Sequence, residues 1–505
     1  MKKILISENP WQARAAITDS DRLQNVYFEP RTTEHLERSF FKGVITKVLP
    51  GIQTAFVDIG KDKAGFLHIS EIDRELAFTR MSDSIVVNED GEEEKKAPER
   101  PRRSSADISK ILKEGESIIV QVNKEPVYEK GAKLTTCFTI PGRFIVLMPN
   151  IPRIGISKKI EDRTERQRLK ALLQSKLPEG MGCIIRTSSE HKSDKEIASD
   201  VAFLVHTWNK ILQKYAKAQP KEKIYQDVGL PLQIVRDYLN DDVETILTNN
   251  KETQYQIYEF VKEIAPEYTH KIKYYSEPPA LFEKYNIEKQ IHEALQKKTF
   301  LRSGGSIIIE TTEAMTVIDV NTGKFTGSSN LEDTILQTNL EAAEEIVRQL
   351  RLRNIGGLIV IDFIDMSIHS NRQKLYNHLE QRLKEYDKFQ SVVLKVSEFG
   401  LVQMTRKRSG KTLQQQLTQT CSCCKGLGVV RSTRTQCYAI LRQVKMELEE
   451  KKKAAYTLFV NPEIFEFLNH TEYNSILDLE KTNSCALTLA ADKKIDPNNF
   501  RLVAK

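Results

Sequence analysis

Two aspartates stand at the ends of apolar stretches in this chain. Asp319 lies in the stretch 315–321 together with Asn321, and Asp362 follows the apolar run 357–361. Neighbouring carboxylates repel one another unless a proton or a cation lies between them, and hard oxygen ligands without His or Cys favour Mg²⁺ or Mn²⁺. The pair could therefore hold a cation, with Asn321 orienting a ligand, a water or a phosphate. Alternatively, both aspartates cap helices or bind loop amides.

The segment between the two aspartates predicts how they meet. Five apolar residues recur there at helical spacing: Leu336, Leu340, Ala343, Val347 and Leu350. The helix should end at 354–357, and residues 358–364 form a continuous apolar strand. A strand, helix and strand in this order make the two strands parallel, with their carboxyl ends at one sheet edge, where open α/β sheets bind ligands. We therefore expect Asp319 and Asp362 to lie close together.

Composition indicates a globular protein of several domains. The 505 residues suffice for roughly three to four domains of ordinary size. No apolar run approaches the ~20 residues of a membrane span, and the polar residues 7–10 end the N-terminal apolar run too early for a signal peptide. We therefore predict a cytoplasmic protein without an integral membrane segment. The net charge of +7 permits a nucleic-acid partner without demanding one.

Short alternating segments between residues 41 and 70, and again at 117–124, predict a small β-barrel. Phe56 and Phe66 lie there among several lysines, a mixture on which nucleic-acid bases stack, and the pattern looks like the OB-fold barrel called the S1 RNA-binding domain. Alternatively, each Phe belongs to ordinary barrel core. The segment 83–108 is rich in mixed charge and poor in apolar residues, which predicts a disordered excursion between two barrel strands.

Two basic features could bind phosphate. Arg186 and Thr187 follow an apolar strand and could offer a guanidinium and a hydroxyl to a terminal phosphate. The run Arg406–Lys411 is expected beside the proposed metal edge, where it would suit a phosphate backbone. The alternatives are a solvated strand end for the first feature and a solvated surface for the second.

A cysteine motif follows the predicted catalytic region. Cys421 and Cys424 form C-x-x-C-x-G-x-G, which resembles a zinc knuckle. Seven cysteines without a secretion signal argue against a disulfide framework. Because the chain has no second C-x-x-C, half a tetrahedral site per chain would suit a zinc ion shared by two protomers. A redox pair or inert thiols are the alternatives.

Together these motifs resemble the catalytic region of the ribonuclease E and ribonuclease G family over essentially the whole chain, because their order and separations match. The matching segments are Ala55–Asp58, Gly65–Leu67, Lys124, Lys130–Ala132, Leu134–Thr136, Val146–Pro149, Gly180–Gly182, Arg186–Thr187, Asp319–Asn321, Arg348–Arg353, Gly357–Met366 and Cys421–Gly428. The resemblance implies an α/β multidomain fold. An RNase H-like subdomain at 1–36 and 232–293 would be split by the S1 barrel at 37–136 and a 5′-sensor at 137–231. A DNase I-like α/β catalytic subdomain would then occupy 294–416, a zinc-link 417–432 and a small α/β assembly domain 433–505.

The resemblance also implies an activity. The chain would be a Mg²⁺-dependent endoribonuclease that hydrolyses single-stranded RNA to 5′-phosphate and 3′-hydroxyl ends and favours 5′-monophosphorylated substrates. Its tasks would be rRNA and tRNA processing and mRNA decay. The alternative is a non-catalytic RNA-binding assembly protein in which the acids are structural.

The resemblance assigns roles to individual residues. The catalytic Mg²⁺ would be held by two of them with the help of a third: Asp319, Asp362 and Asn321. Single-stranded RNA would be bound by Phe56, Phe66, Lys124 and Lys130. A 5′-monophosphate would be sensed by Arg186, Thr187 and the backbone of Val146. Zn²⁺ would be shared between two chains by Cys421 and Cys424, giving a homodimer that pairs into a tetramer.

The chain departs from the family pattern near the cysteines. Ser422 stands where the family usually has Pro, and the additional Cys423 could compete as a ligand or oxidise. Nothing follows the small domain, so we expect no scaffold tail for other degradation enzymes, and the layout is closer to ribonuclease G. A chain from which such a tail was removed would look the same.

Overall fold

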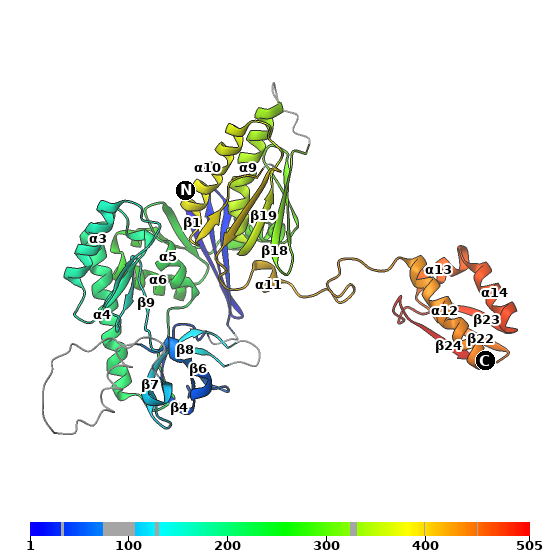
Figure 1. The fold of residues 1–505 in the computed structure, drawn as a ribbon, viewed down its shortest axis with the longest axis horizontal. Helices are drawn as coiled ribbons and strands as arrows, with labels where there is room; N and C mark the ends of the chain where they lie inside the picture. Colours follow the sequence, from blue (N-terminus) through cyan, green and yellow to red (C-terminus); the bar gives the residue numbers. More distant parts are fainter. Residues whose placement is uncertain (32–34, 74–106, 127–130, 324–330, 398, 452) are drawn as a thin grey trace. The chain divides into compact units, whose positions relative to one another are not determined.

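A computed structural model describes residues 1–31, 35–73, 107–126, 131–323, 331–397, 399–451 and 453–505 (Figure 1). Lys130 and nearly all of the predicted excursion at 83–108 lie outside these residues. The chain forms two compact units, Met1–Gln414 and Gln415–Lys505. Among the described residues, no helix combines the length and the apolar content needed to cross a bilayer.

The first sheet joins the N-terminus to residues more than two hundred positions later. Its order is β15-β14-β1-β2-β3, and β1 pairs in parallel with β14 and antiparallel with β2. The strands are β1 (Lys2–Asn9), β2 (Gln12–Asp19), β3 (Arg22–Pro30), β14 (Val243–Thr248) and β15 (Ile272–Tyr274). One core includes apolar residues of α5 (Leu230–Tyr238), α6 (Lys251–Ile264) and η4 (Pro266–Lys271), and another includes residues of α7 (Leu281–Lys284) and α8 (Ile287–Ala294).

The predicted small barrel is confirmed. Its strands are β4 (Phe40–Leu49), β5 (Thr54–Asp58), β6 (Gly65–His68), β7 (Ser117–Lys124) and β8 (Lys133–Thr135). They follow the order β4-β5-β6-β8-β7, and β7 pairs back with β4, which closes the sheet on itself. β13 (Lys223–Tyr225) extends β4 on the outside. Short helical segments flank the strands: η1 (Pro50–Ile52), η2 (Ile69–Glu71) and α2 (Ile108–Ile111).

A four-stranded sheet follows the barrel in sequence, with the order β11-β12-β10-β9. Its strands are β9 (Ile140–Pro141), β10 (Ile145–Met148), β11 (Ile154–Ile156) and β12 (Gly182–Ile185). Two long helices share its core, α3 (Arg163–Lys176) and α4 (Asp194–Lys217). Ser193 and Glu196 form a capping box that fixes the start of α4, because each side chain accepts a backbone N–H of the other.

The sheet that carries the two aspartates has the order β16-β17-β18-β19-β21-β20. Its strands are β16 (Lys298–Phe300), β17 (Ser306–Thr311), β18 (Met315–Asn321), β19 (Gly357–Asp362), β20 (Ser391–Val393) and β21 (Leu401–Arg406). The predicted crossover is confirmed, because α9 (Leu331–Leu352) connects β18 to the parallel strand β19. α10 (His369–Tyr386) packs beside α9, and both contribute to the core of this sheet (Figure 1).

The prediction for the basic run Arg406–Lys411 is wrong. Arg406 pairs with Gly357 at the amino end of β19, whereas Asp362 lies at the carboxyl end. The Arg406 side chain is 1% exposed and donates two hydrogen bonds to Asp387, from Nε to Oδ2 at 2.6 Å and from Nη2 to Oδ1 at 2.9 Å. This arginine therefore joins the end of α10 to β21 inside the protein, and it is not available to an RNA backbone.

The second unit is a small α/β domain, as the sequence indicates. Its sheet has the order β23-β22-β24, with β22 (Ala455–Val460) and β23 (Ala486–Ala491) parallel and β24 (Phe500–Ala504) antiparallel to β22. Its core includes residues of α12 (Thr433–Lys451), α13 (Pro462–His470) and α14 (Tyr473–Asn483). The short helix α11 (Leu413–Leu417) precedes the cysteine motif.

Candidate active site

Asp319 and Asp362 are register partners in the parallel strands β18 and β19. Their apolar neighbours Ile318 and Ile361 are fully buried in the core that α9 and α10 share, whereas Asp319 is half-buried and Asp362 is exposed. Because side chains alternate between the faces of a strand, both carboxylates lie on the face opposite the helices. The structure therefore brings the two predicted aspartates together on an open face, near the carboxyl ends of their strands.

The side chains around the pair fix its geometry. Asn321 Nδ2 donates to Asp319 Oδ2 at 2.7 Å, so the amide orients that carboxylate. On the other strand, the backbone just after Asp362 is held by buried Asn339 of α9, which donates to the carbonyl of Ile364 and accepts its N–H at 2.8 and 3.1 Å. The chain beyond β19 is thus fastened to the crossover helix.

Asp365 is a third acidic residue at this edge, and the sequence analysis gave it no role. Burial, followed by the charges of Asp319 and Asp365, raises the pKa of Asp362. Gly400 packs against Asp365 with a φ of +74°, and a Cβ there would lie 2.9 Å from Asp365 Oδ1. In the sequence, the D-x-x-D spacing of residues 362–365 is the feature that indicates this third acidic residue.

The donor set fits Mg²⁺. In the described part of the chain, no group of three or more His, Cys, Asp or Glu side chains is arranged to enclose a metal ion. A solvent-exposed pair of carboxylates with an amide beside it instead suits a cation that keeps several water ligands. Mg²⁺ usually binds in this way. Burial and then the like charges of Asp319 and Asp365 raise the pKa of Asp362, and such a cation would offset that repulsion.

Phe56 and Phe66 lie on the outer side of the barrel. They are register partners in β5 and β6, and both are half-buried, whereas Ala55, Val57 and Leu67 beside them are fully buried in the core. The alternative that the two rings are ordinary barrel core is therefore wrong.

A row of cations continues from these rings. Phe66 is the partner of Lys133 in β8, and Lys133 is the partner of exposed Lys124 in β7. On the other side, Phe56 is the partner of Lys47 in β4. The barrel thus presents aromatic rings flanked by lysines. Sequence reasoning missed the place of Lys133, which also forms an ion pair with Glu71, because it depends on the parallel pairing of β6 with β8.

Arg186 is not a solvated strand end. Its Nη1 donates to the carbonyl of Gly142 at 2.6 Å and to Asp237 Oδ1 at 2.9 Å. Burial alone would raise the pKa of Asp237, but the charges of Arg186, Arg236 and Lys388 lower it below its ordinary value. An anion that binds Arg186 must therefore share or displace the Asp237 carboxylate.

The backbone beside Arg186 is rigidly held. The N–H of Arg186 donates to the carbonyl of Phe144, and Val146 pairs with Ile184 in the adjacent strand, so Val146, Arg186 and Thr187 lie within one small region. Asp200 accepts the backbone N–H groups of three successive residues, Arg143, Phe144 and Ile145, at 2.8–3.1 Å. Burial raises the pKa of this carboxyl.

Lys388 lies beside the Arg186–Asp237 pair, and sequence reasoning missed it. Its Nζ donates to the carbonyl of Asp237 at 3.2 Å and lies 3.2 Å from the ring centroid of Tyr238. Burial lowers the pKa of Lys388 to about 7, although Asp237 opposes the shift. Lys388 follows Asp387, the partner of Arg406, so one short segment contacts both α5 and strand β21 of the aspartate sheet.

The cysteine motif, in the second unit, has the backbone of a metal knuckle. The N–H of Lys425 donates to the carbonyl of Cys421 at 2.8 Å, and Gly426 and Gly428 have φ values of +91° and +75°. Their positive φ turns both amides toward the Cys424 sulfur, and these amides, Gly428 first, lower the pKa of its thiol. The sulfurs of Cys421 and Cys424 are exposed and half-buried, and two thiolates are half of the ligand set that a tetrahedral zinc site would need.

Two other cysteines have the opposite character. Burial raises the pKa of Cys183 to about 12 and that of Cys437 to about 11. Thiols with such pKa values stay protonated, so neither is suited to bind a metal as a thiolate.

Comparisons with known proteins all match this chain to ribonucleases E and G. A family model described as the ribonuclease E/G family matches residues 139–409, and one described as an RNase E/G thioredoxin-like domain matches residues 420–505. Ribonuclease G of Escherichia coli (strain K12) is 37% identical over 478 residues, which cover 95% of this chain and 94% of the relative. Ribonuclease G of Haemophilus influenzae is 38% identical over 475 residues, covering 94% and 93%. Ribonuclease E of Haemophilus influenzae is 36% identical over 504 residues, covering 99% of this chain and 52% of the relative.

The raised pKa of Asp362 predicts a pH-dependent effect on stability. Above the folded-state pKa of Asp362, its carboxylate is repelled by neighbouring carboxylates in the native protein, and this repulsion is absent from the unfolded chain. Without divalent cations, Asp362→Asn should therefore raise the unfolding temperature at about pH 7 by about 1–3 °C. The difference should shrink as the pH falls through the folded-state pKa of Asp362, because the wild-type carboxyl then takes up its proton. Thermal melts of both proteins at about pH 7 and about pH 4 measure this. A variant less stable than the parent at neutral pH would contradict it.

Proposed function

This chain belongs to the ribonuclease E/G family and is an endoribonuclease of RNA processing or decay, and we propose that it uses Mg²⁺ to cleave single-stranded RNA. The observation that carries the proposal is the pairing of Asp319 with Asp362 in register on the open face of parallel strands. A module that only binds RNA needs no such pair. We further propose a preference for 5′-monophosphorylated substrates and a role in the cytoplasm in rRNA and tRNA processing and mRNA decay.

In the proposed mechanism, Asp319 and Asp362 would hold Mg²⁺. When bound, Mg²⁺ supplies a positive charge that lowers the pKa of an attacking water and offsets the charge that develops on the phosphate. The Asn321 amide keeps the Asp319 carboxylate in place through their 2.7 Å hydrogen bond. Cleavage leaves a 5′-phosphate on one product and a 3′-hydroxyl on the other.

The outer row of the barrel is the proposed contact for unpaired bases. Phe56 and Phe66 offer ring faces on which bases stack, and Lys124 offers a charge to the backbone beside them. Stacking on the two rings requires bases that are not enclosed in a duplex, which supports a single-stranded substrate. The same role is proposed for Lys130 from the family resemblance alone.

Arg186, Thr187 and the backbone of Val146 are the proposed 5′-phosphate sensor. Arg186 already holds one anion, Asp237, at 2.9 Å, which supports a site built for an oxyanion. A terminal monophosphate presents more charge than Asp237 and can compete for the guanidinium, whereas a 5′-hydroxyl presents none.

Cys421 and Cys424 are the proposed zinc ligands, two from each of two chains. The lowered pKa of the Cys424 thiol supports this, because Zn²⁺ binds the thiolate. The shared ion would link a homodimer, and two such dimers would form a tetramer. We also keep as proposals the RNase H-like nature of the first sheet, the DNase I-like nature of the aspartate sheet and the domain limits given above.

The catalytic proposal predicts that Asp319→Asn and Asp362→Asn each reduce RNA cleavage at least about a hundredfold, because each removes a ligand that supplies several kcal/mol of transition-state stabilisation. RNA binding should stay close to that of the parent, since the barrel row is untouched. Cleavage is followed on a 5′-monophosphorylated single-stranded RNA with Mg²⁺ or with chelator, mapping both product ends, and binding by fluorescence anisotropy. Unchanged cleavage in either variant would refute the site.

The sensor proposal predicts that Arg186→Ala abolishes the preference for a 5′-monophosphate over a 5′-hydroxyl. The substitution removes the guanidinium and leaves the aspartates unchanged, so cleavage of the 5′-hydroxyl substrate should be about the same as in the parent. The measurement is kcat/KM on two RNAs that differ only at the 5′ end. Arg163→Ala, an exposed arginine of α3, is the matched control and should keep the preference. Equal discrimination by Arg186→Ala and the parent would remove the sensor.

The zinc proposal predicts one zinc ion per two chains. Cys421→Ser and Cys424→Ser should each lose the metal and the dimer, because two of the four thiolates are removed from every shared site. Cys423→Ser is the matched control and should keep both. Elemental analysis gives the zinc content and sedimentation gives the mass of the assembly. Tetramers that contain no zinc would contradict the link.

A further inference from the structure

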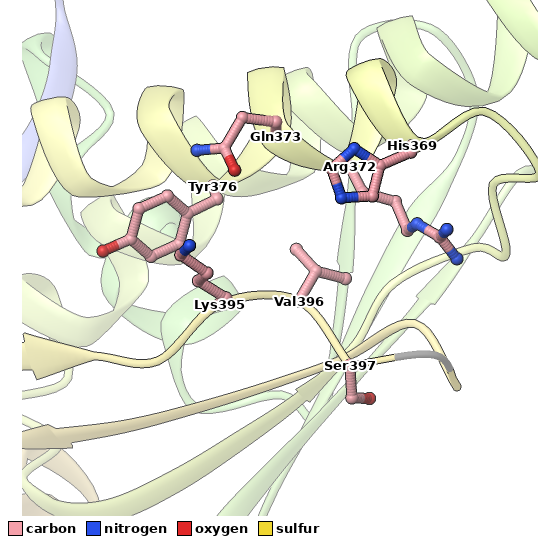
Figure 2. A pocket seen from close by; sticks show the side chains of 7 residues that line it. All are labelled: His369, Arg372, Gln373, Tyr376, Lys395, Val396 and Ser397. Carbon is pink, nitrogen blue, oxygen red and sulfur yellow. The ribbon is translucent and has the colours of Figure 1, made fainter.

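A groove lies between the start of α10 and the segment that follows β20. Seven residues line it: His369, Arg372, Gln373, Tyr376, Lys395, Val396 and Ser397. Figure 2 shows the first four on the helix above and the other three on the loop segment below, on either side of the recess. The space has a volume of about 230 Å³, which is room for a polar group of several heavy atoms.

The groove is basic. Two basic side chains, Arg372 and Lys395, line it beside His369, and within the part of the chain that the structure describes no acidic residue lines it. None of the three forms an ion pair or a side-chain hydrogen bond with any residue that the structure describes. Farther along the same helix two other cations have acidic partners, since Arg382 pairs with Glu344 and Lys384 with Glu161. Unpaired cations gathered in a recess, in a chain that pairs many of its surface charges, indicate an anionic ligand.

The groove adjoins the aspartate edge. Leu401 is the register partner of Asp362, and the turn before it is closed by the N–H of Ser397, which donates to the carbonyl of Leu401 at 2.9 Å. Gly400 in this turn packs against Asp365. On the helix side, α10 begins at His369, shortly after the chain leaves β19. Ser397 and His369 are therefore at the end of the groove nearest to Asp362.

We propose that this groove binds backbone phosphates of the RNA strand whose scissile phosphate lies at Asp319 and Asp362. The inference rests on the proposed function, because it extends the path of the same substrate. A strand that is cut at the carboxyl ends of β18 and β19 must continue away from them, and the groove, which is linked to Asp362 through Ser397 and Leu401, offers two cations there. The planar Arg372 guanidinium suits a bidentate contact with one phosphate, and Lys395 acts as a point charge across the recess.

Binding measurements test the groove independently of cleavage. The full chain carrying Asp319→Asn and Asp362→Asn is titrated with a labelled 5′-hydroxyl single-stranded RNA of about 10 nucleotides at several salt concentrations. Adding Lys395→Ala or Arg372→Gln should weaken binding about tenfold each. Each should also reduce the slope of log affinity against log salt by about 0.7, the value for one lost phosphate contact on a single strand.

Two controls accompany these variants. Lys374→Ala removes an exposed lysine of α10 that does not line the groove and should leave affinity and slope unchanged. Lys395→Arg restores the charge and should restore most of the binding. If Lys395→Ala and Arg372→Gln match the parent in affinity and slope while the parent binds RNA, the groove proposal is overturned and the proposed function stands. If the parent binds no single-stranded RNA, both are overturned.

Discussion

The pairing of β18 with β19 is the constraint on which the proposed chemistry depends. The two strands run parallel, and only their register places Asp319 opposite Asp362. A shift of one residue in β19 would turn Ile361 to the open face and bury the carboxylate against the helices. The register is secured because Ile359 and Ile361 are fully buried beneath α9, and exposing them would cost several kcal/mol. Hydrophobic burial on one face thus holds together two like charges on the other.

Parallel pairing requires a crossover, and here the crossover helix does more than connect. α9 covers the sheet on one face, which leaves the opposite face free for a large substrate. Through Asn339, which is fully buried, it also clamps the backbone between Asp362 and Asp365. Farther away, the buried contact of Arg406 with Asp387 fixes the end of α10 against β21. The aspartates therefore project from a frame with little freedom to separate, which is the condition for keeping a cation site preformed despite repulsion.

Much of this frame could be predicted from the sequence, because local patterns determine it. The helical stripe Leu336–Leu350 and the apolar run after Gly357 give a strand, a helix and a strand, and the handedness and direction of that unit follow from general rules. The small barrel was predictable for the same reason. What failed depended on partners distant in sequence. Arg406 was assigned to the surface because nothing near it in sequence shows that Asp387 pairs with it inside the protein. Lys133 could not be placed beside Phe66 without knowing that β6 pairs with β8.

The proposed phosphate contacts differ in whether the cation already has an acidic partner in the protein. Arg372 and Lys395 have no acidic partner in the described chain, so a phosphate that reaches them displaces no carboxylate that the structure describes, and the gain is affinity for any RNA backbone. Arg186 is held by Asp237, and a ligand must overcome that ion pair before it gains the guanidinium. Displacing Asp237 costs every anion the same free energy, so a weakly binding anion stays unbound, whereas a group with more charge than a carboxylate can recover the loss. Under the proposed function, the Asp237 carboxylate therefore makes the sensor selective, and the unpaired cations of the groove make the hold on the strand general.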